Sequence, residues 1–459
     1  MNFLSLAFVA FLAFTFLVYW HLPRQWRVGF LILASMAYYG IYSPAFLLHF
    51  LAVIAVNYLF AVQIQKSHSK ALVGIAVAAN ILHLAFFKYF NSVFALVAPH
   101  GAALPDWFRV VMPLAISFYT FQFIAFHVDV YRSNAADAPP GAAIQPEGGR
   151  YFLFMLFFPH LISGPILRAA DFYRQIGQEV ASRDMQVRGL YLVALGLTKK
   201  LFIADVLGYL VNPVYKNPTE YGSADALAAI LGYTAQLYCD FSGFIDIARG
   251  VGKLFGYSLP QNFNSPYFAT SFSEFWNRWH MTLSKFIRDC IYIPLGGNRV
   301  SQARQYFNLM TAMVLSGIWH GETANFLLWG ALHGAYLAGE KLIGLSKAPA
   351  NHATWLLRNL WVIVGWSFSL VFFRASDFKT ALAVLGQLFT FKQASLTLSL
   401  VFALILLTWL VQYFELRRER LLAFAMPRAA YVVPLLLVVI YFLISRVQIP
   451  NEAFIYVQF

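Results

Sequence analysis

The chain has 459 residues, of which 60% are hydrophobic and 12% are charged, and its formal net charge at pH 7 is +13. A soluble globular protein carries about 25% charged residues, so this composition excludes an ordinary soluble enzyme and indicates an all-α polytopic membrane protein. The Lys and Arg residues fall mainly in short segments between apolar runs, a distribution that reports membrane topology and gives no support to a nucleic-acid partner.

Apolar runs of about 20 residues, the length that crosses a bilayer as a helix, recur along the chain. The first run, residues 1–20, has neither the basic start nor the cleavage site of a signal peptide, so we expect it to be retained as a span. The strong candidate spans are residues 3–20, 28–48, 50–64, 71–90, 111–128, 187–211, 224–240, 324–344, 356–373, 396–414 and 431–447. Shorter or amphipathic segments are residues 151–163, 242–256, 272–290 and 308–320. Together they predict a bundle of about 11–13 transmembrane or re-entrant helices in contact with membrane lipids.

Basic residues between the spans predict the orientation of the chain. They are Arg24 and Arg27 after the first span, Lys66 and Lys70 after the third, and Arg417, Arg418, Arg420 and Arg428 before the last. Loops rich in Lys and Arg stay in the cytoplasm. Both termini, including Phe459, are therefore predicted on the outer side.

One long polar stretch, residues 134–150, contains Pro139, Pro140 and several glycines and is predicted to be a cytoplasmic loop. It would divide an N-terminal helical layer, residues 1–133, from a core at 151–345 and from C-terminal helices and a tail at 346–459. The chain shows no internal repeat, which weighs against a repeat-built transporter.

Metal chemistry is not expected. Cys239 and Cys290 match no ligand spacing, and the chain contains neither an HxxxH nor an HExxH motif. His83, His127, His160 and His333 are interpreted as packing or hydrogen-bonding residues.

Two carboxylates interrupt the apolar region around residues 236–246. Asp240 and Asp246 flank a predicted helix break at Gly243. Charged groups in such a region need partners or must line a cavity. We expect pairing with Arg249 or Lys253, with the wall of a substrate tunnel as the alternative.

Residues 272–290 fit one amphipathic helix at a membrane surface. The apolar stripe comprises Phe272, Phe275, Trp276, Trp279, Leu283, Phe286, Ile287 and Cys290, and the polar face comprises Glu274, Asn277, Arg278, Ser284, Lys285, Arg288 and Asp289. His280 lies on the border between the two faces. The helix is either an interfacial anchor or a surface on which Arg278, Lys285 and Arg288 bind the phosphates of an acyl donor.

A short apolar segment from Leu309 to Ile318 precedes Trp319 and His320. It is about half a bilayer long, so we expect an interrupted helix that places His320 at membrane depth. An imidazole there would be suited to proton abstraction from a hydroxyl. The alternative is a histidine that hydrogen-bonds between helices.

Four motifs occur together in this chain: FFPHLISGPILR at 157–168, QLYCDFSGFIDIA at 236–248, SFSEFWNRWHMTLSKFIRDCIYIPLGGNR at 271–299 and LSGIWHG at 315–321. In combination they resemble the membrane-bound O-acyltransferase (MBOAT) family, in the branch that acetylates alginate and peptidoglycan. The resemblance covers nearly the whole chain. The Ser-Gly-Phe at 242–244 departs mildly from the Ser-Gly-Tyr-like motif of the family.

The resemblance implies a bundle in the bacterial inner membrane, with inner and outer funnels that meet at a catalytic histidine. The family's invariant histidine corresponds to His320 and its other signature histidine to His280. The resemblance further implies acetyl-CoA as the acyl donor, with no tightly bound cofactor, a cell-surface polysaccharide as the acceptor and a periplasmic SGNH or serine-type acetyltransferase as the partner.

The last residues, Phe454 to Phe459, are similar to the aromatic-tyrosine tail of a small partner in the related D-alanylation system, where the tail carries the acyl group. By this similarity Tyr456 is a candidate acyl carrier; the alternative is an aromatic anchor at the bilayer interface. Three other functions stay open. They are peptidoglycan O-acetylation, D-alanyl transfer to teichoic acid, and a proton-coupled transporter that uses Asp240, Asp246 and His320.

Overall fold

The computed structural model describes residues 5–97, 109–133, 144–162, 164–180, 182–345 and 348–417. These residues form helices joined by turns and loops, without a strand among them, so the predicted all-α class is confirmed. The predicted loop residues 134–143, the predicted span 431–447 and Tyr456 lie outside the described residues. The chain divides into two compact units, residues 1–190 with 248–260 and residues 191–247 with 261–459.

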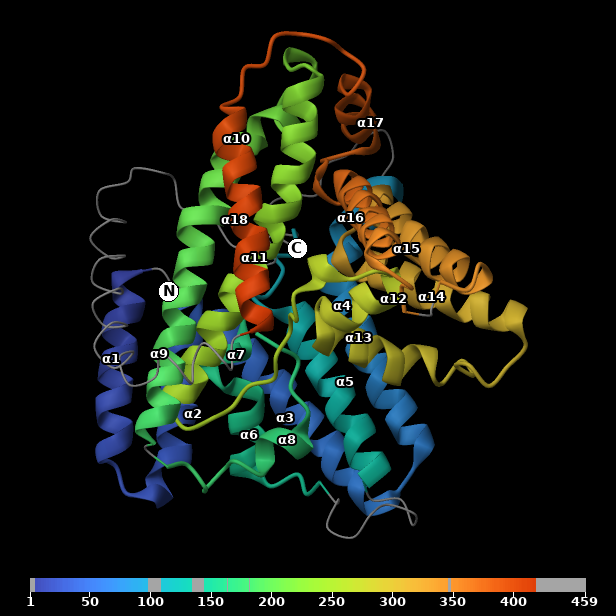
Figure 1. Ribbon diagram of the computed structural model, residues 1–459. Helices are drawn as coiled ribbons and strands as arrows, with labels where there is room; N and C mark the ends of the chain where they lie inside the picture. The colour runs from blue at the N-terminus through green and yellow to red at the C-terminus, as the bar shows by residue number, and fades with distance from the viewer. Residues whose placement is uncertain are drawn as a thin grey trace. The chain divides into compact units, whose positions relative to one another are not determined.

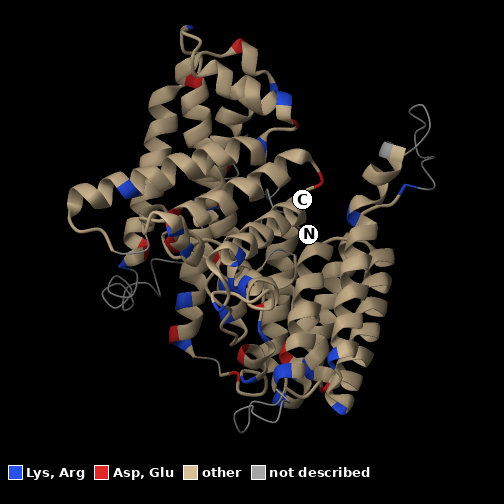
Figure 2. Ribbon diagram, turned by 90° about the vertical axis from the view of Figure 1, so that its right-hand side faces the viewer, with Lys and Arg blue, Asp and Glu red and all other residues tan. Residues whose placement is uncertain are grey.

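The first unit is a layer of long N-terminal helices followed by short ones (Figure 1). Its helices are α1 (Leu6–His21), α2 (Arg24–Tyr42), α3 (Pro44–Ser67), α4 (Lys70–Val97), α5 (Ile116–Ser133), α6 (Gly148–Leu156), α7 (Phe158–Leu161) and α8 (Ala169–Tyr173). Ser43 begins α3 by accepting a hydrogen bond from the Phe46 N–H, with Pro44 in the first turn, a strong helix-start signal. Figure 2 shows charged residues mainly near helix ends and in the segments between helices.

The second unit contains the helices that carry the candidate functional residues. α9 (Arg183–Thr198) and α11 (Ser223–Leu254) each belong to both units. The other elements are η3 (Lys199–Ala204), α10 (Asp205–Lys216), η4 (Pro218–Glu220), η5 (Pro266–Phe268), α12 (Phe272–Arg278), α13 (Met281–Ile287), η6 (Arg288–Tyr292), α14 (Gln302–His320), α15 (Ala324–Leu342), α16 (His352–Arg374), α17 (Phe378–Gln387) and α18 (Leu398–Leu416).

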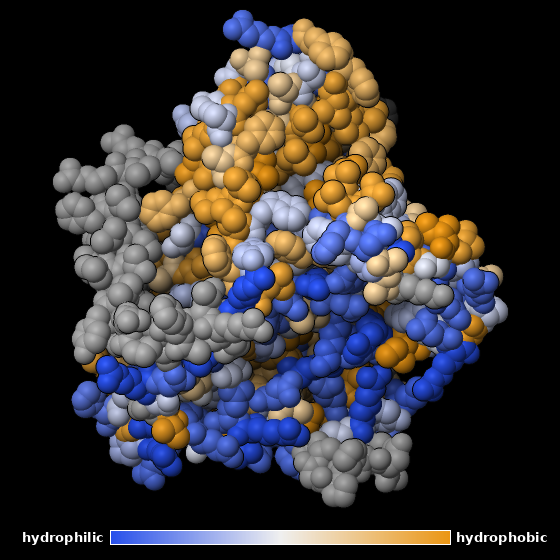
Figure 3. All heavy atoms as spheres, in the orientation of Figure 1, coloured by the Kyte–Doolittle hydropathy of each residue, from blue (hydrophilic) through white to orange (hydrophobic). Residues whose placement is uncertain are grey.

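Four helices among the described residues, α3, α4, α16 and α18, are long and apolar enough to cross a membrane, and α1 is a shorter apolar helix. Leu406 and Leu410 on α18 are 61% and 44% exposed. Figure 3 shows hydrophobic side chains gathered over this part of the second unit. Such extended apolar surface is typical of contact with lipid. The total number of crossings stays a prediction.

The predicted break at Gly243 is wrong, because α11 is one helix of 32 residues. Gly243 instead permits close packing against α9. A Cβ atom on Gly243 would lie 2.8 Å from the carbonyl oxygen of Gly196, and one on Gly196 would lie 2.4 Å from that of Gly243. The glycines therefore bring two helix backbones together.

Candidate active site

His320 is the last residue of α14, at the tip of a tight hairpin formed by α14 and α15 (Figure 1). The two helices approach closely through glycines. A Cβ atom on Gly317 would lie 2.2 Å from the carbonyl oxygen of Phe326, and one on Gly330 would lie 2.5 Å from that of Met313. This hairpin fixes the position of His320.

The predicted interruption at His320 is present, because α14 ends there and α15 begins at Ala324, but the expectation of a half-length helix before it is wrong. α14 has 19 residues, or about 28 Å at 1.5 Å per residue. Its polar first half is helical because the adjacent loop accepts its side-chain hydrogen bonds: Asn308 donates to the Leu295 carbonyl at 3.1 Å, and Gln305 donates to the Val300 carbonyl at 2.8 Å. The apolar run marked only the second half of the helix.

Aromatic rings surround the buried His320. Its ring centroid lies 4.7 Å from Trp319, 5.1 Å from Trp329 and 5.3 Å from Phe373. Only 2% of His320 is exposed. A low-dielectric setting of this kind strengthens any interaction with charge that develops during a reaction.

The segment 272–290 does not form the predicted single helix at a membrane surface. α12 ends at Arg278, α13 begins at Met281, and His280 between them has a left-handed backbone with φ 43°. Asn262 causes the change of direction. Its backbone oxygen accepts from the Met281 N–H at 2.9 Å, and its side-chain oxygen accepts from the Thr282 N–H at 3.0 Å.

The predicted apolar stripe is nevertheless buried within the second unit. Its buried members are Phe272, Phe275, Trp276, Trp279, Leu283, Phe286 and Ile287, whereas Cys290 is half-buried. Trp276, for example, packs against Trp329 and Trp366 with centroid distances of 5.9 and 6.2 Å. These aromatic partners inside the protein hold the stripe.

His280 has a different setting from His320. It is fully buried, its ring lies 4.8 Å from Phe241, and its Nδ1 is 3.3 Å from the Asn262 side-chain oxygen. These contacts support the turn between α12 and α13, so they favour a structural contribution for His280.

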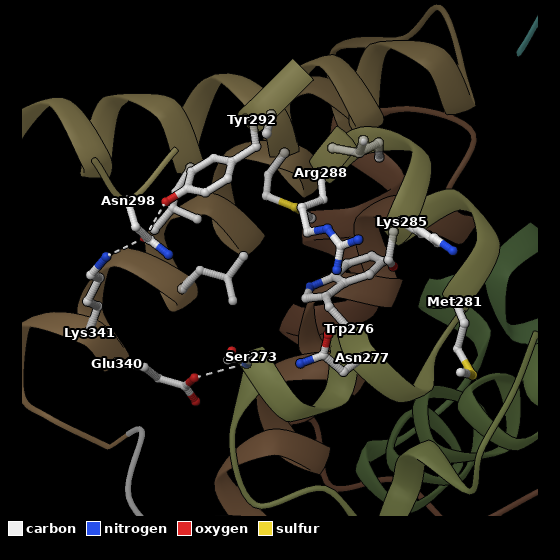
Figure 4. A pocket seen from close by; sticks show the side chains of 16 residues that line it. Ser273, Trp276, Asn277, Met281, Lys285, Arg288, Tyr292, Asn298, Glu340 and Lys341 are labelled. Atoms are coloured by element: carbon white, nitrogen blue, oxygen red, sulfur yellow. Dashed lines mark hydrogen bonds between the residues drawn. The ribbon is translucent and has the colours of Figure 1, made fainter. Parts of the chain in front are cut away.

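A cavity of about 780 Å³ opens beside α12 and α13 (Figure 4). Its lining combines the cations Lys285, Arg288 and Lys341 with apolar side chains such as Leu309 and Met313. A volume of several hundred Å³ suits a ligand of cofactor size. The combination of charge and apolar surface matches a ligand with anionic and apolar parts.

Two of the three predicted phosphate-binding cations line this cavity together. Arg278 does not line it; it lines a neighbouring cavity of about 630 Å³ and donates to Glu274 at 2.7 Å. Lys341 on α15 was not predicted, because it lies at the end of an apolar run. Its polar partners, Asn298 and Gln305, lie more than 30 residues earlier in the chain, so its own segment gives no signal of this role.

The aromatic residues Trp276 and Trp329 lie between the cavity and His320 as a chain of ring contacts. Trp276 lines the cavity and packs against Trp329, which packs against His320. His320 itself does not line the cavity. Ring contacts therefore connect the cavity wall to His320.

Asp240 and Asp246 each bind a lysine that was not predicted as a partner. Asp240 binds Lys200 at 2.7 Å, and Asp246 binds Lys199 at 2.7 Å. Each lysine also binds a second carboxylate, Asp205 or Glu415. These two lysines were not predicted because they lie within the predicted span 187–211, from which η3 directs them to α11.

The structure confirms hydrogen-bonding roles for four other histidines. The contacts are His127 with Asn57 at 2.8 Å, His160 with Gln122 at 3.1 Å, His333 with Ser369 at 2.9 Å and His83 with His49 at 3.1 Å. Within the part of the chain that the structure describes, no group of three His, Cys, Asp or Glu residues has a geometry that would hold a metal ion.

Comparison with known proteins shows which family this chain belongs to. Residues 145–384 match the model of the membrane-bound O-acyltransferase (MBOAT) family. The chain is 35% identical to the probable alginate O-acetylase AlgI of Pseudomonas aeruginosa, over 87% of this chain and 78% of that protein.

The names of two further relatives refer to other polymers. The chain is 34% identical to the peptidoglycan O-acetyltransferase of Helicobacter pylori, over 79% of this chain and 73% of that protein. It is 29% identical to the teichoic acid D-alanyltransferase of Bacillus subtilis, over 65% of this chain and 75% of that protein. The chain belongs to the membrane-bound O-acyltransferase family and is an acyltransferase.

Proposed function

We propose that this protein takes an acetyl group from acetyl-CoA on the cytoplasmic side of the bacterial inner membrane and delivers it for O-acetylation of an alginate-like surface polysaccharide. The observation that carries the proposal is the cavity with Lys285 and Arg288 on its wall, connected by aromatic rings to His320. The match to alginate O-acetylase over most of the chain supports the acceptor.

In the proposed reaction, His320 accepts the proton of an acceptor hydroxyl while the oxygen attacks the thioester carbonyl carbon. The carbon–sulfur bond then breaks, and the proton passes to the leaving thiolate, which gives an ester and free CoA. A neutral imidazole suits both proton transfers. Its aromatic surroundings exclude water, which would otherwise compete as the nucleophile.

His280 has a supporting role in this proposal. It fixes the turn that separates Trp276 on α12 from Lys285 on α13. A substitution there would displace both the aromatic contact and the cation.

The outward transfer requires a carrier or a partner. We assign the first acceptor to Tyr456 and the next step to a periplasmic serine-type acetyltransferase, with both termini on the periplasmic side. The aromatic sequence from Phe454 to Phe459 supports this assignment. Tyr456→Phe would remove the hydroxyl, so polymer acetate should fall while acetyl-CoA binding is retained. Unchanged polymer acetate would exclude the carrier role.

Peptidoglycan is the second candidate acceptor, because the Helicobacter pylori relative covers nearly as much of this chain. The teichoic acid relative is less similar, and family membership leaves no support for the transporter.

The acceptor is tested in a host that produces alginate and has lost its own membrane acetylase but retains its other acetylation proteins. Ester-bound acetate is measured separately in purified polysaccharide and in purified peptidoglycan. The proposal predicts that expression of this chain restores acetate on the polysaccharide. Acetate that appears only on peptidoglycan would overturn the alginate acceptor while leaving the acyltransferase reaction intact.

A further inference from the structure

The cations of the cavity lie in two groups on opposite sides. Figure 4 shows Lys285 and Arg288 on one side and Lys341 with Asn298 on the other. The first group comes from α13 and η6, and Lys341 comes from α15. Phosphate groups bind to such cations through charge-assisted hydrogen bonds.

Lys341 is held in place by polar side chains. Its Nζ donates to the Asn298 side-chain oxygen at 3.1 Å and also to Gln305. Tyr292 donates to the same Asn298 oxygen at 2.8 Å. Because a lysine ammonium has three N–H donors, these two bonds leave one donor for a ligand.

The loop that carries Asn298 is itself fixed to α14. Gln305 donates to the backbone oxygens of Asn298 and Val300 at 3.1 and 2.8 Å. The position of the ammonium group is therefore set before a ligand binds, which lowers the entropic cost of binding.

We infer that Lys341 forms a second phosphate-binding position, separate from Lys285 and Arg288, and that the donor carries two separated phosphate groups. This inference rests on the proposed function. A free CoA thioester has a diphosphate and a 3′-phosphate at separate places. A pantetheine arm attached to a carrier protein has one phosphodiester. The two cation groups therefore assign free acyl-CoA as the donor.

The inference makes Lys341 a determinant of donor choice. Its side chain would recognise the phosphate that acetyl-CoA has and that the single-phosphate donor lacks. Glu340, the neighbouring acidic side chain on the cavity wall, is engaged elsewhere: its carboxylate accepts the backbone N–H groups of Phe272 and Ser273 at 2.7 and 3.2 Å.

The test measures dissociation constants of purified full-length protein in detergent for acetyl-CoA, 3′-dephospho-acetyl-CoA and acetyl-phosphopantetheine. The wild type should bind acetyl-CoA about tenfold more tightly than either analogue, the order of one hydrogen bond to a charged group. Lys341→Gln should remove this preference. Lys341→Arg, which retains the charge, should keep most of it, and Lys379→Gln on α17, away from the cavity, should keep all of it.

The ratio between ligands separates recognition from damage to the fold, because a misfolded cavity weakens all three ligands together. Equal binding of acetyl-CoA and acetyl-phosphopantetheine by the wild type would overturn the inference. So would a Lys341→Gln variant with the wild-type preference. Failure of the wild type to bind any of the three thioesters would instead overturn the proposed function.

Discussion

The imidazole of His320 lies edge-on to the indole of Trp329, with ring centroids 5.1 Å apart and an interplanar angle of 84°. On another side Trp329 contacts Trp276, which lines the proposed donor cavity. Under the proposed function, the aromatic residues would have two roles. They would keep water from His320, and they would limit the space available to the acyl group.

Trp276→Ala should enlarge that space. Burial of the two additional methylene groups of a butyryl chain contributes about 1.6 kcal/mol of favourable free energy. The rate with butyryl-CoA relative to acetyl-CoA should therefore rise roughly tenfold. The two rates are compared in membranes that contain equal amounts of protein. Trp355→Ala, in the neighbouring cavity, is the matched control and should keep the wild-type ratio. A wild-type ratio in Trp276→Ala would contradict the limiting role of this indole.

Gly330→Ala should destabilise the hairpin of α14 and α15. The new methyl group would lie 2.5 Å from the Met313 carbonyl oxygen, and overpacking of this kind costs about 1–3 kcal/mol. Gly339→Ala in the same helix meets nothing within 4 Å and should be neutral or stabilise the protein by about 0.4–1 kcal/mol. Thermal unfolding of both variants in detergent measures the difference. An equal effect of the two substitutions would show that the close approach has no energetic weight.

Lys199→Met should be strongly destabilising. Lys199 is 1% exposed and binds Asp246 and Glu415, so its loss removes a buried cation that both carboxylates bind. Loss of one partner from a buried ion pair costs about 3–5 kcal/mol. Lys253→Met is the control, since Lys253 contacts the exposed Ser258 at 3.4 Å. Unfolding midpoints that fall equally in both variants would contradict the assigned pairing.

Glu274 predicts a pH dependence of stability. Burial opposes its ionisation, but hydrogen bonds from Thr270 and the charge of Arg278 outweigh burial and lower the pKa of Glu274 below its ordinary value. A lowered pKa stabilises the folded state above the unfolded pKa of about 4.3, and this stabilisation is lost as pH falls through the folded value.

Glu274→Gln should therefore lower the unfolding midpoint at pH 7 and reduce the fall in the midpoint between pH 7 and pH 4. The exposed Glu220, changed to Gln, provides the control and should follow the wild type. If Glu274→Gln also follows the wild type at both pH values, the carboxylate contributes nothing to stability through these contacts.

The helices whose positions were predicted best from the sequence are those with one uninterrupted apolar run. α1, α3, α4, α16 and α18 each correspond to a candidate span, because length and hydropathy are local properties. α17 was missed, since its ten residues are too few for a span. Its start was nevertheless encoded, because Asp377 accepts from the Thr380 N–H as an N-cap residue does.

The candidate site was predictable in part. Lys285 and Arg288 were placed on one surface correctly, since they are three positions apart and residues at that spacing share a helix face. The break at His280 depends on Asn262, and the pairing of Lys199 depends on Asp246 and Glu415. Such contacts join residues far apart in the chain, so the helical period of a single segment carries no information about them.

The most direct test of this account compares His320→Gln with His333→Gln. Both histidines pack against Trp329, with centroids 5.1 and 4.8 Å away, but His333 also bonds Ser369. Polymer-bound acetate is measured over time at equal membrane abundance of each variant. Loss of a general base lowers the rate roughly 10²–10⁴-fold, so His320→Gln should lose acetylation while His333→Gln stays within about tenfold of the wild type. A His320→Gln variant as active as His333→Gln would contradict the catalytic role of His320.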